Sequence, residues 1–153
     1  MRAGCPFITC AIKKKGIEFC WQCDESVTCE RWSAHRKFSR EYDTFVCYQK
    51  LEDNIASIQR HGIDAFEESQ RIREKFLKDM LSNFNEGRSK SYYCVAVTVF
   101  EIEDLKVALA QIRKESDGLP IKERSKMLHT IMNKIAEDKL YDLRLRKPST
   151  KAG

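Results

Sequence analysis

A run of cysteines near the N-terminus constrains this 153-residue chain more than any other feature. The stretch from Cys5 to Cys29 reads CPFITCAIKKKGIEFCWQCDESVTC and holds five of the chain's seven cysteines. Cys20 and Cys23 form a C-x₂-C turn, and Cys5 and Cys10 form a C-x₄-C turn, at the wide end of the spacing that zinc ligands use. Cys29 follows shortly afterwards. Because cysteines cluster in this way at metal sites in reducing compartments, the pattern predicts a metal-binding head.

Five cysteines are more than one tetrahedral zinc ion needs, so two ligand sets remain open. The set with the better paired spacing is Cys5, Cys10, Cys20 and Cys23. The second set leaves out the cysteine nearest the end of the chain, where ordering is weakest, and consists of Cys10, Cys20, Cys23 and Cys29. His35 is an alternative for one thiolate, although a lone histidine is more often an ordinary surface or core residue.

The residues between the cysteines predict the local structure of the head. KKKG is typical of the end of a short helix, with lysines in the last turn and Gly16 as its cap. Those lysines would offset the negative charge of a thiolate cluster. Phe19, Trp21 and Trp32 are predicted either to cover the sulfurs or to pack the head against the rest of the protein.

Three chemistries compete for the cysteines. Closed coordination by four thiolates makes one structural zinc per chain the leading interpretation, and an iron–sulfur cluster the alternative metal centre. The CWQC turn also resembles the C-x-x-C of dithiol oxidoreductases, but no βαβ pattern surrounds it. Cys47 and Cys94 lie singly in apolar patterns and are predicted to pack.

No other catalytic or cofactor-binding constellation is recognisable. The chain lacks a G-x-x-x-x-G-K-[ST] phosphate loop, a G-x-G-x-x-G turn, an H-E-x-x-H helix and a serine nucleophile elbow. Its three histidines, His35, His61 and His129, are scattered. The sequence therefore names no catalytic residue, and whether the protein is an enzyme stays open, with a non-catalytic module favoured.

Helical periodicity dominates the chain after the head. The stretch 43–62 places an apolar face at Phe45, Tyr48, Leu51, Ile55 and Ile58, with Gly62 where a helix would end. A second amphipathic helix follows to about residue 84, with Asp64 and Glu67 at capping-box spacing.

The remaining segments are also predicted to be helices. SYYCVAVTVF, residues 91–100, has strand propensity but no strand to pair with, so it is interpreted as a buried helix. Residues 101–116 have acids in the first turn and one apolar face. After Asp117 and Gly118, Pro120 opens a last helix with an apolar stripe at Ile121, Leu128, Ile131 and Ile135.

The sequence thus predicts a mostly α protein with a small Cys-rich metal-binding N-terminal head followed by a helical bundle. The predicted parts are a zinc-binding head over 1–40, a helical bundle over 41–143 and a basic flexible tail over 144–153. No apolar run is long enough to span a membrane, and the N-terminus lacks the pattern of a secretory signal, so a cytoplasmic protein without a membrane partner is expected.

The partner is not specified by the sequence. Another protein is one candidate. Nucleic acid is weakly supported by the net charge of +5 and by basic residues near the C-terminus, namely Lys139, Arg144, Arg146, Lys147 and Lys151.

The cysteine stretch resembles the signature of an uncharacterised prokaryotic family, domain of unknown function 3795. Its members carry a Cys-Pro opening, a CA-x-x-KG segment, a C-x-x-C and a last cysteine, and the similarity continues through YQKLEDNIASIQRHGIDAF and FNEGRSKSYYCVAVTVFEIEDLKVAL. The resemblance implies metal binding and marks Cys5, Cys10, Cys20, Cys23 and Cys29, but it implies no activity. Val27-Thr28 replaces the usual Phe-Pro before the last cysteine, and the further upstream cysteines of longer members are missing here.

Overall fold

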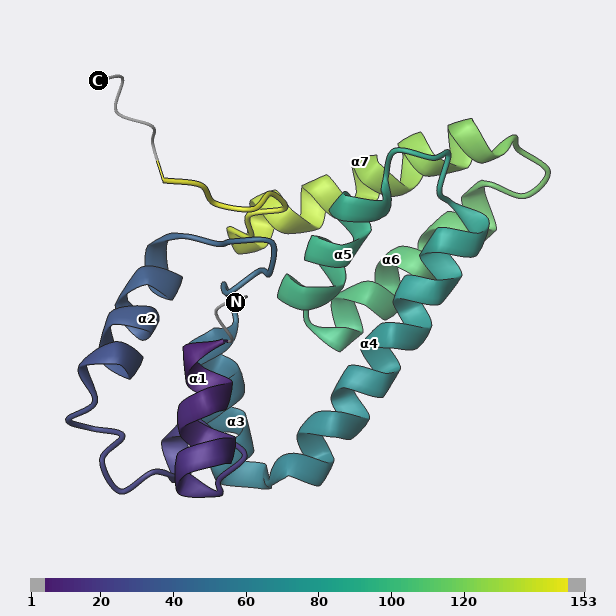
Figure 1. Cartoon of the computed structure of the whole chain (residues 1–153). Coiled ribbons are helices and arrows are strands. Elements are labelled where there is room, and N and C mark those ends of the chain that lie inside the picture. The colour runs from purple at the N-terminus through teal and green to yellow at the C-terminus, as the bar shows by residue number, and fades with distance from the viewer. Residues whose placement is uncertain (1–4, 149–153) are drawn as a thin grey trace, which may run out of the picture. The chain divides into compact units, whose positions relative to one another are not determined.

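The computed structural model describes residues 5–148 of the chain (Figure 1). Within this range the regular secondary structure is helical, and no β-strand occurs. The predicted mostly α class is therefore confirmed. In chain order the elements are α1 (Pro6–Ile8), the π-helix η1 (Thr9–Lys15), the 3₁₀-helix η2 (Cys20–Gln22), α2 (Glu30–Glu41), α3 (Leu51–His61), α4 (Ile63–Asn83), α5 (Lys90–Val99), α6 (Ile102–Glu115) and α7 (Ile121–Lys139).

The described chain divides into two compact units. Unit 1 ends at Glu41 and contains α1, η1, η2 and α2, together with the five clustered cysteines. Unit 2 begins at Tyr42 and contains α3 to α7. Among the helices of the described range, none combines the length and the apolar character that a membrane span requires.

Unit 2 has a hydrophobic core built from its last four helices. α4 packs along α5, and α6 packs against both α4 and α7 (Figure 1). Tyr93, Phe100, Leu105 and Met132 are fully buried there. Each fully buried side chain of this size contributes about 1.5–3 kcal/mol relative to exposure. The apolar residues that recur with helical spacing in the sequence therefore lie on the helix faces that pack together in this core.

The segment of ambiguous propensity, α5, is a buried helix as predicted. Val95, Ala96, Val97 and Val99 are all buried in the core of unit 2. β-branched residues disfavour a helix by only some tenths of a kcal/mol each, whereas burial of their side chains contributes more. Tertiary packing therefore overrides the strand propensity of this segment.

The helix predicted to start near Asp43 begins only at Leu51, so this prediction was wrong at its N-terminal end. The Asp43 carboxylate accepts hydrogen bonds from the backbone N–H groups of Tyr48 and Arg146, and it pairs with the Arg146 guanidinium at 3.0 Å. Aspartate that binds nearby backbone groups competes with helix formation. Phe45, predicted to lie on the buried face, is 92% exposed.

The junction between α3 and α4 confirms one predicted boundary and corrects another. Gly62 ends α3 with a φ of 83°, which favours glycine, and its N–H donates to the Ile58 carbonyl at 2.8 Å. Gly62 is also the N-cap of α4, which starts at the next residue without a side-chain cap. Asp64 lies in the first turn of α4 and does not form the predicted capping box with Glu67. The helix therefore starts two residues earlier than a capping box would place it.

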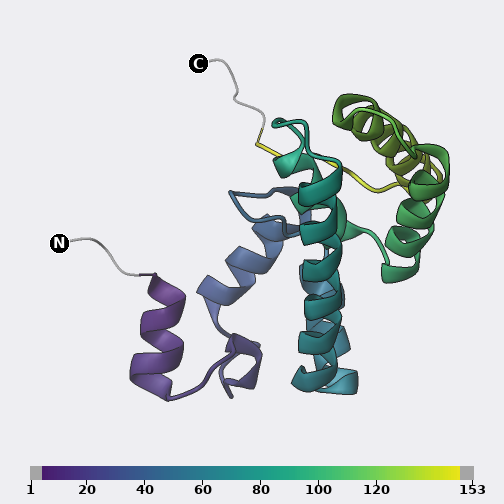
Figure 2. The ribbon, with the colours of Figure 1, turned by 90° about the vertical axis from the view of Figure 1, so that its right-hand side faces the viewer.

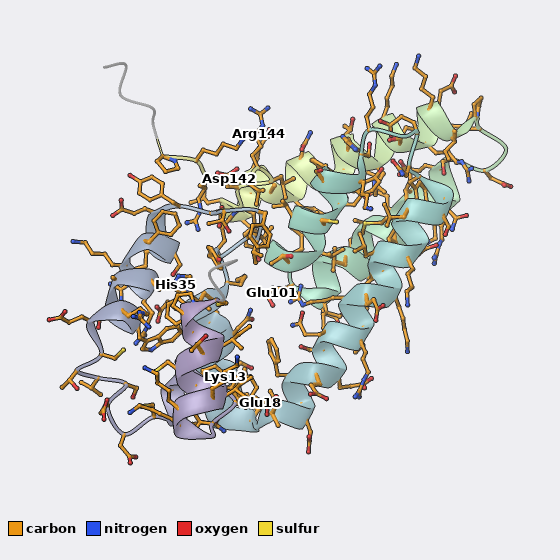
Figure 3. All side chains as sticks on the ribbon, in the orientation of Figure 1. Lys13, Glu18, His35, Glu101, Asp142 and Arg144 are labelled. Carbon is orange, nitrogen blue, oxygen red and sulfur yellow. The ribbon has the colours of Figure 1, made fainter. Side chains whose placement is uncertain are left out.

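The segment after α7 is anchored by hydrogen bonds to the segment that precedes α3, within unit 2. The Arg146 carbonyl accepts the Asp43 N–H at 2.7 Å. The side-chain amide of Gln49 donates to the carbonyl oxygens of Asp142, at 2.9 Å, and Arg144, at 3.4 Å. Figure 3 labels Asp142 and Arg144 on this segment. The predicted basic tail is thus anchored as far as Arg146, and residues 149–153 lie outside the described range.

A polar cluster also joins the loop before α5 to α7. The hydroxyl groups of Ser89 and Ser125 each donate to the same Glu86 carboxylate oxygen at 2.6 Å. Both serines are almost fully buried. These hydrogen bonds lower the pKa of Glu86 to about 2, because they stabilise the charged carboxylate.

Candidate metal centre

The five clustered cysteines lie at or near the ends of short elements in unit 1. Cys5 is the N-cap of α1, and Cys10 lies in η1. Cys20 opens η2, and the N–H of Cys23 donates to the Cys20 carbonyl at 3.2 Å, which closes the C-x₂-C turn. Cys29 directly precedes α2, and its carbonyl oxygen accepts a hydrogen bond from the first turn of that helix.

Gly16 reverses the chain between η1 and η2. It ends η1 in the left-handed conformation, with a φ of 63°, and its N–H donates to the Ala11 carbonyl. This confirms the helix end that KKKG predicts. Lys13 on η1 and Glu18 after the reversal are labelled in Figure 3. Figure 2 shows α1 and η1 as one continuous coil.

Gln22 fixes the start of the CWQC turn. Its side-chain oxygen accepts hydrogen bonds from the N–H groups of Glu18, at 3.1 Å, and Phe19, at 2.9 Å. These bonds satisfy two donors at the start of a short helix, which would otherwise depend on water. The turn that carries Cys20 and Cys23 is therefore ordered by a residue between them.

A single cavity within unit 1 brings four of the five cysteines together. Its volume is about 310 Å³. Its thiol-bearing wall consists of Cys10, Cys20, Cys23 and Cys29. These residues come from η1, from η2 and its flank, and from the start of α2, so the cavity joins all the main elements of the unit.

Cys5 has a different environment from the other four. It is exposed, whereas the other four are half-buried, and it does not belong to the cavity wall. It lies close enough to contribute, as the smallest effect, to the raised pKa of Cys20. Of the two predicted ligand sets, the structure gathers the one that contains Cys29 around the cavity.

Burial and the neighbouring thiols disfavour the ionisation of Cys20. Burial raises the pKa of Cys20, and the neighbouring Cys29, Cys10 and Cys23 raise it further, in that order. Several thiolates in one place repel each other unless a cation compensates them. A metal cation at this position would remove the repulsion and favour loss of the thiol protons.

Lys15 supplies positive charge at the cavity wall. Its ammonium group pairs with Glu25 at 2.9 Å. Contacts with Glu25 first, and then with the Cys23 thiol, raise the pKa of Lys15. Of the lysines predicted to lie near the cysteines, the structure therefore places Lys15 against them.

Aromatic side chains contribute unequally to the site. Trp32 is 9% exposed and forms part of the cavity wall with Phe7, whose ring meets it edge-on at 6.3 Å. His35 packs its ring against Phe7 at 5.1 Å and lies outside the wall of the cavity. Phe19 and Trp21 stack on each other at 4.4 Å, also outside the wall. Of the three predicted covering residues, the structure places Trp32 at the cavity.

The cysteines surround the cavity without converging on one point. In residues 5–148, no group of three or more His, Cys, Asp or Glu side chains is arranged to hold a metal ion. A single zinc ion needs four ligand atoms about 2.0–2.3 Å from one centre. The thiols of this structure therefore do not have the arrangement of a closed single-ion site.

Several residues of the wall had no role in the sequence prediction. Phe7 contributes apolar surface, and Glu25, Glu30 and Arg31 contribute charge. Glu30 and Arg31 directly follow Cys29, so proximity in the sequence was the available signal. Phe7 lies between Cys5 and Cys10 and had the same signal, but its contact with Trp32 joins segments that are distant in the sequence.

The other two cysteines belong to unit 2. Cys47 packs against the core of unit 2, and burial raises the pKa of its thiol. Cys94 is half-buried on α5. Both line a second cavity of about 400 Å³, together with the exposed Phe45. This environment agrees with their predicted packing role.

Comparisons with known proteins identify no relative. No protein-family model matches the chain. No curated protein matches it. No solved structure matches it either. The resemblance to the uncharacterised cysteine-rich family therefore stays a prediction.

Proposed function

We propose that unit 1 is a metal-binding module in which thiolates of Cys10, Cys20, Cys23 and Cys29 hold a metal centre. The observation that carries the proposal is the single cavity around which these four residues gather. Four thiolates suit both of the predicted centres, a zinc ion and an iron–sulfur cluster. Cys5 is assigned no ligand role.

The metal centre would serve the architecture of unit 1. Its ligands would tie η1, η2 and the start of α2 to each other, and unit 1 has few buried apolar residues, Ala11 and Trp32 among them. Small units with little core commonly depend on such a metal for folding. When four thiolates close the coordination, no position remains for a substrate, so the module is non-catalytic.

Unit 2 would then carry the contact with a partner, for which a protein is the favoured class. Phe45 is 92% exposed and Val46 is 43% exposed in the segment before α3. Exposed large apolar side chains that adjoin one another mark protein-contact surfaces when they form a patch.

The test compares two double variants of the full chain. Cys20→Ser/Cys23→Ser removes two proposed ligands, and Cys47→Ser/Cys94→Ser is the matched control in unit 2. Metal per chain is measured by elemental mass spectrometry. The first variant should lose the metal, and the control should retain it at the level of the unaltered protein.

Tryptophan fluorescence adds a readout that is confined to unit 1. The chain has two tryptophans, Trp21 and Trp32, and both lie in this unit. Chelation of the metal should change their emission in the unaltered protein, but not in Cys20→Ser/Cys23→Ser. Equal metal content in both double variants would contradict the proposed function.

A further inference from the structure

The cavity of unit 1 is larger than a single metal ion requires. In a four-thiolate zinc site the sulfurs lie about 2.3 Å from the ion and enclose it, which leaves no internal space. Here the four cysteines border a cavity of about 310 Å³. In residues 5–148 no three potential ligands are arranged around one ion. An occupant larger than one ion, which binds each thiolate at a separate position, is compatible with both observations.

A polynuclear core meets both requirements. In a cubane iron–sulfur cluster each of four cysteines binds a different iron atom, and bridging sulfides occupy the space between them. The ligand sulfurs are consequently farther apart than around zinc. The chemistry of the wall is compatible, because all four ligand candidates are thiols and no histidine borders the cavity.

One side of the cavity wall is apolar. Phe7, Ala11, Ile17 and Trp32 give the cavity an apolar side. An apolar shell limits solvent access and thereby affects the reduction potential of a cluster.

The charged residues of the wall are balanced in number. Lys15 and Arg31 oppose Glu25 and Glu30. Lys15 is the cation in contact with a ligand candidate, the Cys23 thiol. A cation in contact with a cluster sulfur stabilises the more negative, reduced state, so Lys15 is placed to raise the potential.

We propose that this cavity holds an iron–sulfur cluster ligated by Cys10, Cys20, Cys23 and Cys29. This inference rests on the proposed function, since it requires that unit 1 bind metal through these thiolates. It goes further by naming the class of cofactor and by assigning Lys15 as a residue that sets its potential. Each of the four thiols loses its proton, and each thiolate forms one bond to one iron atom.

The experiment uses the full chain, isolated without oxygen and then incubated with ferric iron, sulfide and a thiol reductant, which reduces two of every four ferric ions as the cluster forms. Iron, zinc and acid-labile sulfide are measured per chain, together with absorbance near 400 nm. We expect about four iron and four sulfide per chain, and a brown colour. The Cys5→Ser variant is the matched control and should keep the cluster, whereas Cys29→Ser should lose it.

A second variant tests the assignment of Lys15. Lys15→Met keeps an unbranched side chain and removes the charge, so it should retain iron and sulfide while lowering the reduction potential measured by spectroscopic titration. An unchanged potential would overturn the role of Lys15.

The outcomes separate this inference from the proposed function. Tightly bound zinc that iron and sulfide do not replace would overturn the cluster and leave the metal-binding module standing. Absence of any bound metal under both conditions would overturn both. Iron retained in Cys29→Ser and lost in Cys5→Ser would overturn the ligand assignment.

Discussion

Replacement of Asp43 by alanine should strongly destabilise unit 2, because this residue joins its two ends. The Asp43 side chain is fully buried in its ion pair, and the Arg146 side chain is 21% exposed. The carboxylate accepts hydrogen bonds from two backbone N–H groups, of Tyr48 and Arg146, and two from the guanidinium. The Asp43→Ala variant removes all four bonds at once.

The magnitude follows from the donors that lose their acceptor. A hydrogen bond to a charged group contributes about 1.5–3 kcal/mol, and removal of one partner of a buried pair costs about 3–5 kcal/mol. Partial exposure of Arg146 lets water hydrate the guanidinium, so the two backbone donors dominate. We therefore expect a loss of about 3 kcal/mol, or roughly 12 °C in Tm for a unit of this size.

The effect should also depend on pH. Burial alone would raise the pKa of Asp43, but hydrogen bonds from Arg146 and from the Tyr48 N–H hold it below its ordinary value of 3.8. The stabilisation is therefore fully present above about pH 4 and is lost as the pH falls through the lowered pKa of the folded state. The difference between Asp43→Ala and the unaltered protein should shrink in strong acid.

Urea unfolding followed by far-ultraviolet circular dichroism is the appropriate assay, since both tryptophans lie in unit 1. Asp53→Ala is the matched control, because Asp53 is 70% exposed and pairs with Lys50 at 3.2 Å. Exposed pairs of this kind contribute less than about 1 kcal/mol. If Asp43→Ala costs no more than Asp53→Ala, the reasoning about the buried pair is wrong.

Three further predictions concern unit 2. Leu140 ends α7 with a φ of 57°, which disfavours residues with a Cβ atom, and its side chain is 92% exposed. Leu140→Gly should therefore stabilise unit 2 by about 1 kcal/mol in urea unfolding, whereas Leu140→Ala, which keeps the Cβ, should not. Ser125→Ala removes a buried hydrogen-bond donor to Glu86 and should lower the free energy of unfolding by about 1–2 kcal/mol in the same assay. An unchanged midpoint of urea unfolding would refute this expectation. The pKa of Glu86 falls from its ordinary 4.5 to about 2, so the stability that its carboxylate contributes is present above about pH 4.5 and is lost toward pH 2. Glu86→Gln should flatten this part of the pH–stability curve. An unaltered curve would contradict the role of the Glu86 carboxylate.

Periodicity was sufficient to predict most of the helices, because their apolar faces meet in one core. The stripes of α4, α6 and α7 followed from it, except that Ile121 at the start of α7 is 38% exposed. α5 was instead predicted from the lack of a second strand with which it could pair. Periodicity failed for the segment before α3, where Asp43 and Arg146, distant in the sequence, bind each other and replace helical bonds. No local pattern of apolar residues can report such a contact.

The sequence also predicted only part of the candidate metal site. The spacing of the cysteines marked them as candidate metal ligands, and the residues KKKG correctly predicted the end of η1 at Gly16. Spacing alone left the choice between Cys5 and Cys29 open, because that choice depends on how α2 approaches η1 in three dimensions. Phe7 escaped prediction for the same reason.

The proposed centre is tested most directly by which thiols the bound metal protects. The metal-bound full chain is treated with iodoacetamide before and after chelation, and the modified cysteines are located by mass spectrometry. We expect Cys5 to react in both states, whereas Cys10, Cys20, Cys23 and Cys29 should react only after the metal is removed. Equal reaction of these four thiols with and without metal would show that they are not its ligands.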